Sequence, residues 1–259
     1  MTWWEGAILG FLQGATEFLP VSSSGHLVMG QALLGLRLPG LGFEVALHLA
    51  TLLSVLVVYR ERIASLLGGV VRGDSDALRY SGLLIVASVP AAGVGLGFEE
   101  RFDALFDIPW VTGVALLVTG VILWTSRAAL RREPSREPGL GDAVLMGVAQ
   151  AAAIIPGISR SGSTVVTGLW RGVAPQEAAA FSFLMSIPAV GGAAVLKLPE
   201  MLAGDAGASS GVLLLGAAVA CVTGVLAIRT FVAMLRHRSF HHFAPYLWVV
   251  GVLFLLASR

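Results

Sequence analysis

Long apolar runs, separated by short polar segments, make up most of this chain. Six of these runs are close to the ~20 residues that a helix needs to cross a bilayer. Each is predicted to form one transmembrane helix, and they cover residues 43–60, 79–97, 109–126, 176–196, 210–231 and 243–258. The pattern therefore predicts an all-α integral membrane protein with six transmembrane helices.

Two further apolar stretches, residues 5–36 and 141–172, are interrupted by Pro, Gly and Ser. Proline ends a helix because its ring blocks the preceding turn, so both stretches are predicted to be helix, break and helix. Irregular backbone at membrane depth is tolerated only where it is buried in protein or lines a wet cavity. We therefore expect two re-entrant helical hairpins, each entering and leaving on one side.

The composition agrees with a membrane location. Hydrophobic residues make up 56% of the chain and charged residues 13%, where a soluble domain has about 25% charged residues. The mean hydropathy is +0.83. The formal net charge of +1 says nothing about nucleic acid. For a chain that lies mostly in the bilayer, we expect membrane lipids as partners and no nucleic acid. The single cysteine, Cys221, excludes an intrachain disulfide and a cysteine-rich zinc site.

Loop charges predict the orientation. Arginines gather in the predicted loops 60–79 and 127–140 and in the segment 229–238, whereas the loop 98–108 is acidic. Positively charged loops stay in the cytoplasm, so these three segments are expected there. Counting spans back from them places both termini and the first hairpin on the external side. The second hairpin then enters from the cytoplasm.

The two hairpins resemble each other. The segment GFLQGATEFLPVSSSGH, from Gly10, aligns with GVAQAAAIIPGISRSGS, from Gly147. Three spans separate them, and an odd number inverts the second copy. We expect one membrane domain, 1–259, built as an inverted-topology repeat of about 1–127 and about 141–259, with the broken segments meeting near the midplane. Chance similarity between two apolar stretches rich in Gly and Ser is the alternative.

Polar residues that could carry chemistry lie around each break. Gln13 and Glu17 share one helix face ahead of Pro20, and Ser22, Ser23, Ser24 and His26 follow it. Ionisable groups at membrane depth are costly and so are candidates for function. The alternative, without a catalytic role, is a polar and partly exposed N-terminal segment with capping serines.

The second break contains a cation among hydroxyl groups. Arg160 is flanked by Ser159, Ser161, Ser163 and Thr164. A helix that begins here would direct free amide groups at a bound anion, and an arginine adds a fork that matches phosphate oxygens. The sequence therefore predicts an oxyanion cradle. The alternative is an arginine that extends to the membrane interface beside capping serines.

These motifs, in this order, resemble those of the undecaprenyl-diphosphate phosphatase family of the bacitracin-resistance type. The resemblance covers essentially the whole chain. It implies a bacterial cytoplasmic (inner) membrane enzyme that converts a C55 isoprenoid diphosphate to the monophosphate lipid carrier of cell-wall synthesis. It also implies a divalent cation, Mg²⁺ or Ca²⁺. The loop charges, which place the first hairpin outside, lead us to expect a site that opens to the external side. The family motif begins with Glu or Gln, and this chain has Gln13.

Roles can be assigned on this basis. Glu17 is the only carboxylate near either break, so it is the expected metal ligand or base, and Arg160 is the expected phosphate-binding cation. Ser23 is the favoured nucleophile, activated by Glu17 or His26, but attack by His26 itself stays open. The catalytic candidates are thus Glu17, Ser23, His26 and Arg160, with substrate contacts from Gln13, Ser22, Ser159, Ser161 and Thr164.

The sequence also fits two other classes of membrane protein. A transporter or flippase for polyprenyl phosphates also fits an inverted repeat with broken helices, and a lipid-binding resistance protein is a third class. The cluster of serine, carboxylate and imidazole favours an enzyme. His48, on the first span, could face the site, but a core position is favoured, since a lone histidine on an apolar face is usually a core residue. A homodimer is left open.

Overall fold

A computed structural model describes residues 1–36, 42–98, 105, 108–203 and 208–257 of the chain. Every regular element in those residues is a helix. In chain order they are α1 (Trp3–Phe18), α2 (Ser23–Leu33), α3 (Gly42–Val58), α4 (Arg60–Arg72), α5 (Ser75–Gly97), α7 (Pro109–Arg131), α8 (Leu140–Ala152), α9 (Arg160–Trp170), α10 (Pro175–Leu184), α11 (Ser186–Ala203), α12 (Ser210–Arg236), the short 3₁₀ turn η1 (Phe240–His242) and α13 (Phe243–Ala257).

The helical class and the membrane-spanning helices are confirmed. Among the described residues, five helical stretches are long and apolar enough to cross a membrane, and α3 with α4 makes a sixth if this bent pair is taken together. The third predicted run, 109–126, is α7, and the fourth is α10 followed directly by α11. The number of crossings and their direction relative to a bilayer stay predictions.

One predicted loop is wrong. Residues 60–72, placed in the cytoplasmic loop 60–79, form helix α4, which is bent by 77° from α3. Its arginines lie among apolar residues at helical spacing, and Ile63 and Leu66 pack against the core beside Tyr80. This helix ends at Gly73, whose positive φ of 73° allows the chain to turn into α5. Arginine-rich composition had suggested a loop, but an amphipathic helix carries the same charges.

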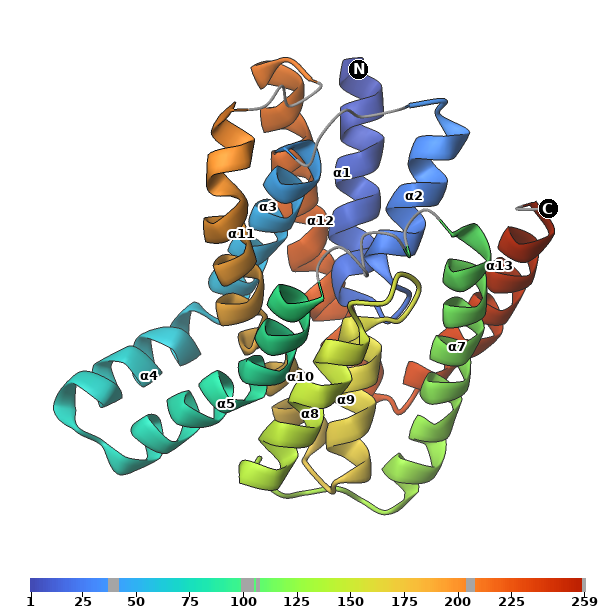
Figure 1. Ribbon diagram of the computed structural model, residues 1–259. Helices are drawn as coiled ribbons and strands as arrows, with labels where there is room; N and C mark the ends of the chain where they lie inside the picture. The colour runs from blue at the N-terminus through green and yellow to red at the C-terminus, as the bar shows by residue number, and fades with distance from the viewer. Residues whose placement is uncertain (37–41, 99–104, 106–107, 204–207, 258–259) are drawn as a thin grey trace.

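Both predicted hairpins are confirmed as helix, break and helix. The first consists of α1 and α2, and the second of α8 and α9. In Figure 1 the first hairpin fills the upper half and the second the lower half, so that their turns meet in the middle of the molecule, with both chain ends in the upper half. This placement agrees with two hairpins that enter from opposite sides, which the internal repeat predicts.

Small residues allow the hairpins to pack closely on the long helices. Gly6, Gly10 and Gly14 recur every four residues along α1, and this face lies against α12, a small-residue spacing that lets membrane helices approach closely. A Cβ atom on Gly10 would collide with the carbonyl oxygen of Gly216 in α12. In the second hairpin, Gly147 of α8 faces the backbone of α5 in the same way. Each hairpin is therefore fixed by a helix from the other half of the chain.

We predict that Gly10→Ala destabilises the protein by ~1–3 kcal/mol, the usual cost of overpacking. The added methyl group must push α1 away from α12, because its nearest neighbours are backbone atoms. Thermal unfolding in detergent measures the effect. Gly82→Ala in α5 is the matched control, since a Cβ there meets nothing within 4 Å. Equal melting temperatures for both variants would contradict this account of the α1–α12 contact.

Candidate active site

The first break ends α1 and exposes a serine turn. Leu19 leaves the helix in an extended conformation, Pro20 follows, and Ser22 has a positive φ of 69°, which is unusual for a residue other than glycine. Helix α2 then begins at Ser23. The turn folds Ser23 back toward the last turn of α1, as the sequence predicts.

Glu17 is the centre of the site. Its Oε2 atom accepts hydrogen bonds from Ser23 Oγ at 2.6 Å and from Gln13 Nε2 at 3.1 Å. Its Oε1 atom accepts from Arg160 Nη2 at 2.7 Å. Only 9% of the Glu17 side chain is exposed. Three residues that the sequence assigned to the site therefore converge on one buried carboxylate.

Arg160 comes from the opposite hairpin. It is the first residue of α9, and its Nη1 atom also donates to the Ser182 carbonyl oxygen at 3.3 Å. Its side chain is 15% exposed, so it lies inside the protein rather than reaching a membrane interface. The ion pair with Glu17 joins two residues 143 positions apart in sequence. The prediction that the two breaks meet is thus confirmed by a direct contact.

Three of the hydroxyl groups near Arg160, those of Ser159, Ser161 and Thr164, form hydrogen bonds within the protein. Ser159 caps α9 by accepting from the Gly162 amide at 3.1 Å. Ser161 donates to the Leu19 carbonyl across the two breaks at 3.3 Å, and Thr164 pairs with Ser182 at 2.6 Å. Ser159, Ser161 and Thr164 therefore stabilise the site through contacts within the protein. Their predicted contacts with phosphate stay predictions.

His26 is held away from Ser23. Its Nδ1 atom lies 2.8 Å from the Ser22 carbonyl oxygen, which can only accept, so Nδ1 carries the proton. Its Nε2 atom lies 2.7 Å from the Tyr246 hydroxyl on α13, with the two rings stacked. The ring therefore supports the backbone of the serine turn, and Glu17, not His26, is the ionisable side chain that contacts Ser23. The predicted phosphate contact of Ser22, whose Oγ lies 3.3 Å from Ser24 Oγ, remains untested.

We predict that Tyr246→Phe lowers kcat by about tenfold, the equivalent of ~1.4 kcal/mol, with little change in KM. Loss of the hydroxyl frees His26 to reorient and loosens the turn that presents Ser23. Steady-state kinetics measure the effect. Tyr59→Phe, at the end of α3, removes a hydroxyl outside the site and should leave kcat unchanged. An unchanged kcat in Tyr246→Phe would mean that α13 does not support the turn.

His48 was wrongly predicted to be a core residue. Its side chain is 36% exposed, and its Nε2 atom lies 3.9 Å from Glu17 Oε2. It lines a small pocket together with Glu17 and Arg160. Glu44, His48 and Thr51 share one face of α3, and this polar stripe is a signal that could have identified it. No comparable pattern marks Tyr246, which reaches His26 from 220 positions away.

The donor set fits a hard divalent cation that is held largely by a phosphorylated ligand. No cluster of three or more His, Cys, Asp or Glu side chains occurs in the described ranges, so the protein alone offers no full coordination shell. Glu17 supplies one carboxylate. Gln13 Oε1 is buried and has no hydrogen-bond partner among the described atoms, which leaves a neutral oxygen beside it. Magnesium is often bound through one or two carboxylates together with phosphate oxygens.

Fold and site together define a polytopic membrane protein with a buried carboxylate that links a hydroxyl group to an arginine across two broken helices. The chain belongs to the bacitracin resistance protein BacA family, whose model matches residues 6–253. Three curated relatives are each named undecaprenyl-diphosphatase. The protein of Syntrophotalea carbinolica is 42% identical over 100% of both chains. The proteins of Desulforapulum autotrophicum, covering 100% of this chain and 99% of its own, and of Rubrobacter xylanophilus, covering 96% of each, are both 41% identical.

Proposed function

We propose that this protein hydrolyses undecaprenyl diphosphate to undecaprenyl phosphate and inorganic phosphate, and so recycles the lipid carrier of cell-wall synthesis. Family membership and the relatives' names support the reaction. The observation that carries it for this chain is the contact of Glu17 with both Ser23, at 2.6 Å, and Arg160, at 2.7 Å. A base, a hydroxyl group and a phosphate-binding cation are what phosphoryl transfer requires.

Binding would begin at Arg160. In the structure, the guanidinium group of Arg160 donates hydrogen bonds to Glu17 and to the Ser182 carbonyl oxygen. The terminal phosphate of the substrate would accept these hydrogen bonds instead. The two planar hydrogen bonds of an arginine match two phosphate oxygens. As Arg160 turns toward the phosphate, Glu17 Oε1 is released from the guanidinium group while Oε2 keeps its contact with Ser23, so the carboxylate can take the serine proton. Substrate binding would thereby activate the nucleophile.

The phosphoryl group would pass first to Ser23 and then to water. Ser23 Oγ attacks the terminal phosphorus while its proton passes to Glu17, and the bond from that phosphorus to the bridging oxygen breaks. Undecaprenyl phosphate leaves with the bridging oxygen. The departing phosphate takes up the proton from Glu17, which becomes a carboxylate again. A water molecule then attacks the phosphorus of the phosphoserine and gives a proton to Glu17, the bond from phosphorus to Ser23 Oγ breaks, inorganic phosphate leaves, and Glu17 returns that proton to Ser23. Arg160 stabilises the charge on the non-bridging oxygens in both steps.

We also propose that Mg²⁺ or Ca²⁺ assists, held by Glu17, the amide oxygen of Gln13 and the diphosphate. When bound, such a cation neutralises negative charge on the phosphate oxygens. The carboxylate of Glu17 would then serve both the cation and Ser23, which its two oxygens allow.

The active site is proposed to open to the external face of the membrane. The arginine-rich segments predict the cytoplasmic side, so the first hairpin would open to the external face of the bacterial inner membrane. Impermeant labelling of cysteines placed at residues 2 and 259 in intact cells tests this. Both positions should react, and labelling of one terminus alone would contradict the inverted repeat.

Phosphate release from C55 diphosphate by the purified protein in detergent tests the function. We expect turnover that EDTA abolishes and that added Mg²⁺ or Ca²⁺ restores. Activity that persists in EDTA would remove the cation from the proposal. No phosphate release, combined with transfer of labelled undecaprenyl phosphate across vesicles, would favour the flippase alternative.

A further inference from the structure

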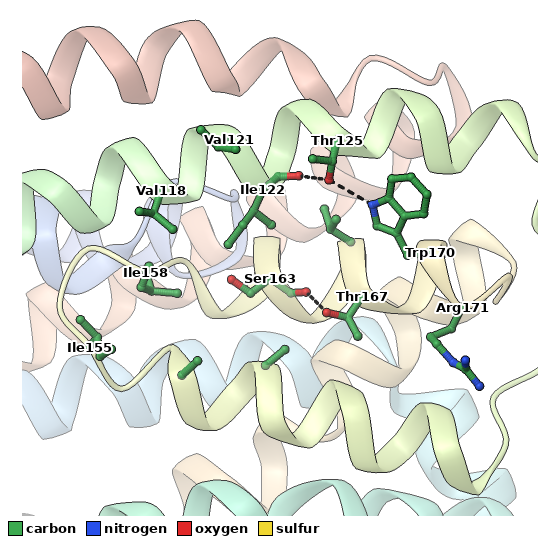
Figure 2. A pocket seen from close by; sticks show the side chains of 13 residues that line it. Val118, Val121, Ile122, Thr125, Ile155, Ile158, Ser163, Thr167, Trp170 and Arg171 are labelled. Carbon is green, nitrogen blue, oxygen red and sulfur yellow. Dashed lines mark hydrogen bonds between the residues drawn. The ribbon is translucent and has the colours of Figure 1, made fainter.

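An apolar groove runs along the outside of the second hairpin, separate from the active site. Its volume is about 510 Å³, within the size range of small-molecule sites. Figure 2 shows α7 on one side and the α8 helix on the other, with α9 between them and Ile155 and Ile158 at the inner end. The groove is open to the exterior of the helical bundle. In a membrane this face meets lipid chains.

The groove and the active site use different faces of α9. Ser163, Thr167 and Trp170 face the groove, and their spacing of three and four residues puts them on one stripe of the helix. Arg160 instead contacts Glu17 and Ser182. A ligand in the groove would therefore not occupy the phosphate cradle.

One wall of the groove holds a hydroxyl group that the protein leaves unsatisfied. Ser163 is 5% exposed, and its Oγ has no hydrogen-bond partner among the described residues. An acyl chain would give this hydroxyl no partner, so the apolar side chains around Ser163, and not Ser163 itself, would hold such a chain. Figure 2 shows the Ser163 side chain directed into the groove.

The outer end of the groove is basic. Arg171 lines it, with a side chain 48% exposed and its Nε atom 3.0 Å from the buried carboxylate of Asp142. Arg132 lies over the Trp170 ring, with its guanidinium carbon 4.7 Å from the ring centroid. The Trp170 Nε1 atom donates to Thr125 at 3.0 Å, which fixes the ring between the groove and this arginine. The guanidinium groups of Arg132 and Arg171 thus lie at the outer end of the apolar groove.

We propose that this groove binds one anionic glycerophospholipid, with an acyl chain along α9 and the phosphate against Arg132 and Arg171. An apolar channel that ends at two cations beside a tryptophan matches a lipid at the level where its head group begins. Arg160 and Arg171 are about 16 Å apart along the helix, at 1.5 Å per residue. The lipid head would therefore lie at the far end of α9 from the catalytic carboxylate, and this site is independent of the proposed phosphatase activity.

Native mass spectrometry of the purified protein with phosphatidylglycerol or phosphatidylcholine tests the site. We expect one phosphatidylglycerol to be retained at least tenfold better than phosphatidylcholine. Ala152→Phe should fill the groove and abolish retention, and Arg132→Gln should abolish the preference for the anionic lipid without touching the apolar walls. Arg171 is left intact, because removing it would strip the buried Asp142 of a partner.

Val144→Phe is the matched control, since Val144 is exposed on α8 and does not line the groove. It should retain the lipid as the unmodified protein does. Equal retention of both lipids by the unmodified protein, or unchanged preference in Arg132→Gln, would overturn the proposal. Displacement of the lipid by undecaprenyl phosphate at equal concentration would also overturn it, because the groove would then hold the enzyme's own product. Phosphate release by Arg132→Gln should stay normal in every case.

Discussion

Replacing Glu17 by glutamine is expected to lower kcat by about a thousandfold, a typical loss for a general base. The amide keeps the shape of the side chain but must direct its oxygen at Arg160, because a guanidinium group can only donate. Its NH₂ group then faces Ser23, which must accept a hydrogen bond where it now donates one at 2.6 Å. The serine loses the acceptor for its proton.

The variant should nevertheless fold. The amide oxygen still satisfies Arg160, and Gln13 can reverse its own amide to accept from the new NH₂ group. Melting temperature and elution volume in detergent check this. Glu177→Gln is the control, since it removes a carboxylate that pairs with Arg62 on the surface and should leave kcat unchanged. A Glu17→Gln enzyme that is folded and retains more than a tenth of its rate would exclude Glu17 as the base.

Much of the site could be predicted from the sequence because its residues lie beside helix breaks. Pro20 and the positive φ of Ser22 are local features, and Gln13 and Glu17 share one helix face at a spacing of four. The pairing of Glu17 with Arg160 is not local, and it was not predicted; the internal repeat indicated only that the two breaks meet at the same depth. The internal repeat thus predicted that two segments distant in sequence lie close together, which the local helix propensities of these segments do not.

Tyr246, His48 and α4 show where sequence reasoning stopped. The tyrosine lies on an apolar helix, and its contact with His26 depends on how α13 packs against α7, which no spacing in the chain encodes. His48 was judged by its apolar neighbours, although a turn of α3 directs it at Glu17. Helix α4 was assigned to a loop because charge was weighted above periodicity. In each case the deciding quantity was tertiary packing or the arrangement of charges around a helix.

Ser23 Oγ is the expected attacking atom. Ser23→Ala is expected to lower turnover by at least about a thousandfold, since loss of a nucleophile removes the step on which the others depend. Ser24→Ala is the matched control. It is the same substitution one residue later, at a side chain whose recorded partner is Ser22 at 3.3 Å, and it should keep most of its rate. Phosphate release from C55 diphosphate measures both.

A chemical trap distinguishes attack by Ser23 from mere orientation of a water molecule. Acid quenching of the enzyme during its first turnover should leave a phosphoryl group on the peptide that contains Ser23, and mass spectrometry locates it. Because Glu17 contacts Ser23 while both nitrogens of His26 are engaged elsewhere, His26→Ala should lower the rate but still form the phosphoserine. If Ser23→Ala keeps most of its rate while His26→Ala is inert, the nucleophile is the imidazole. Because phosphohistidine is hydrolysed in acid but stable in alkali, a parallel alkaline quench tests His26. If neither quench leaves a phosphorylated residue and Glu17→Gln is inactive, Glu17 activates water directly.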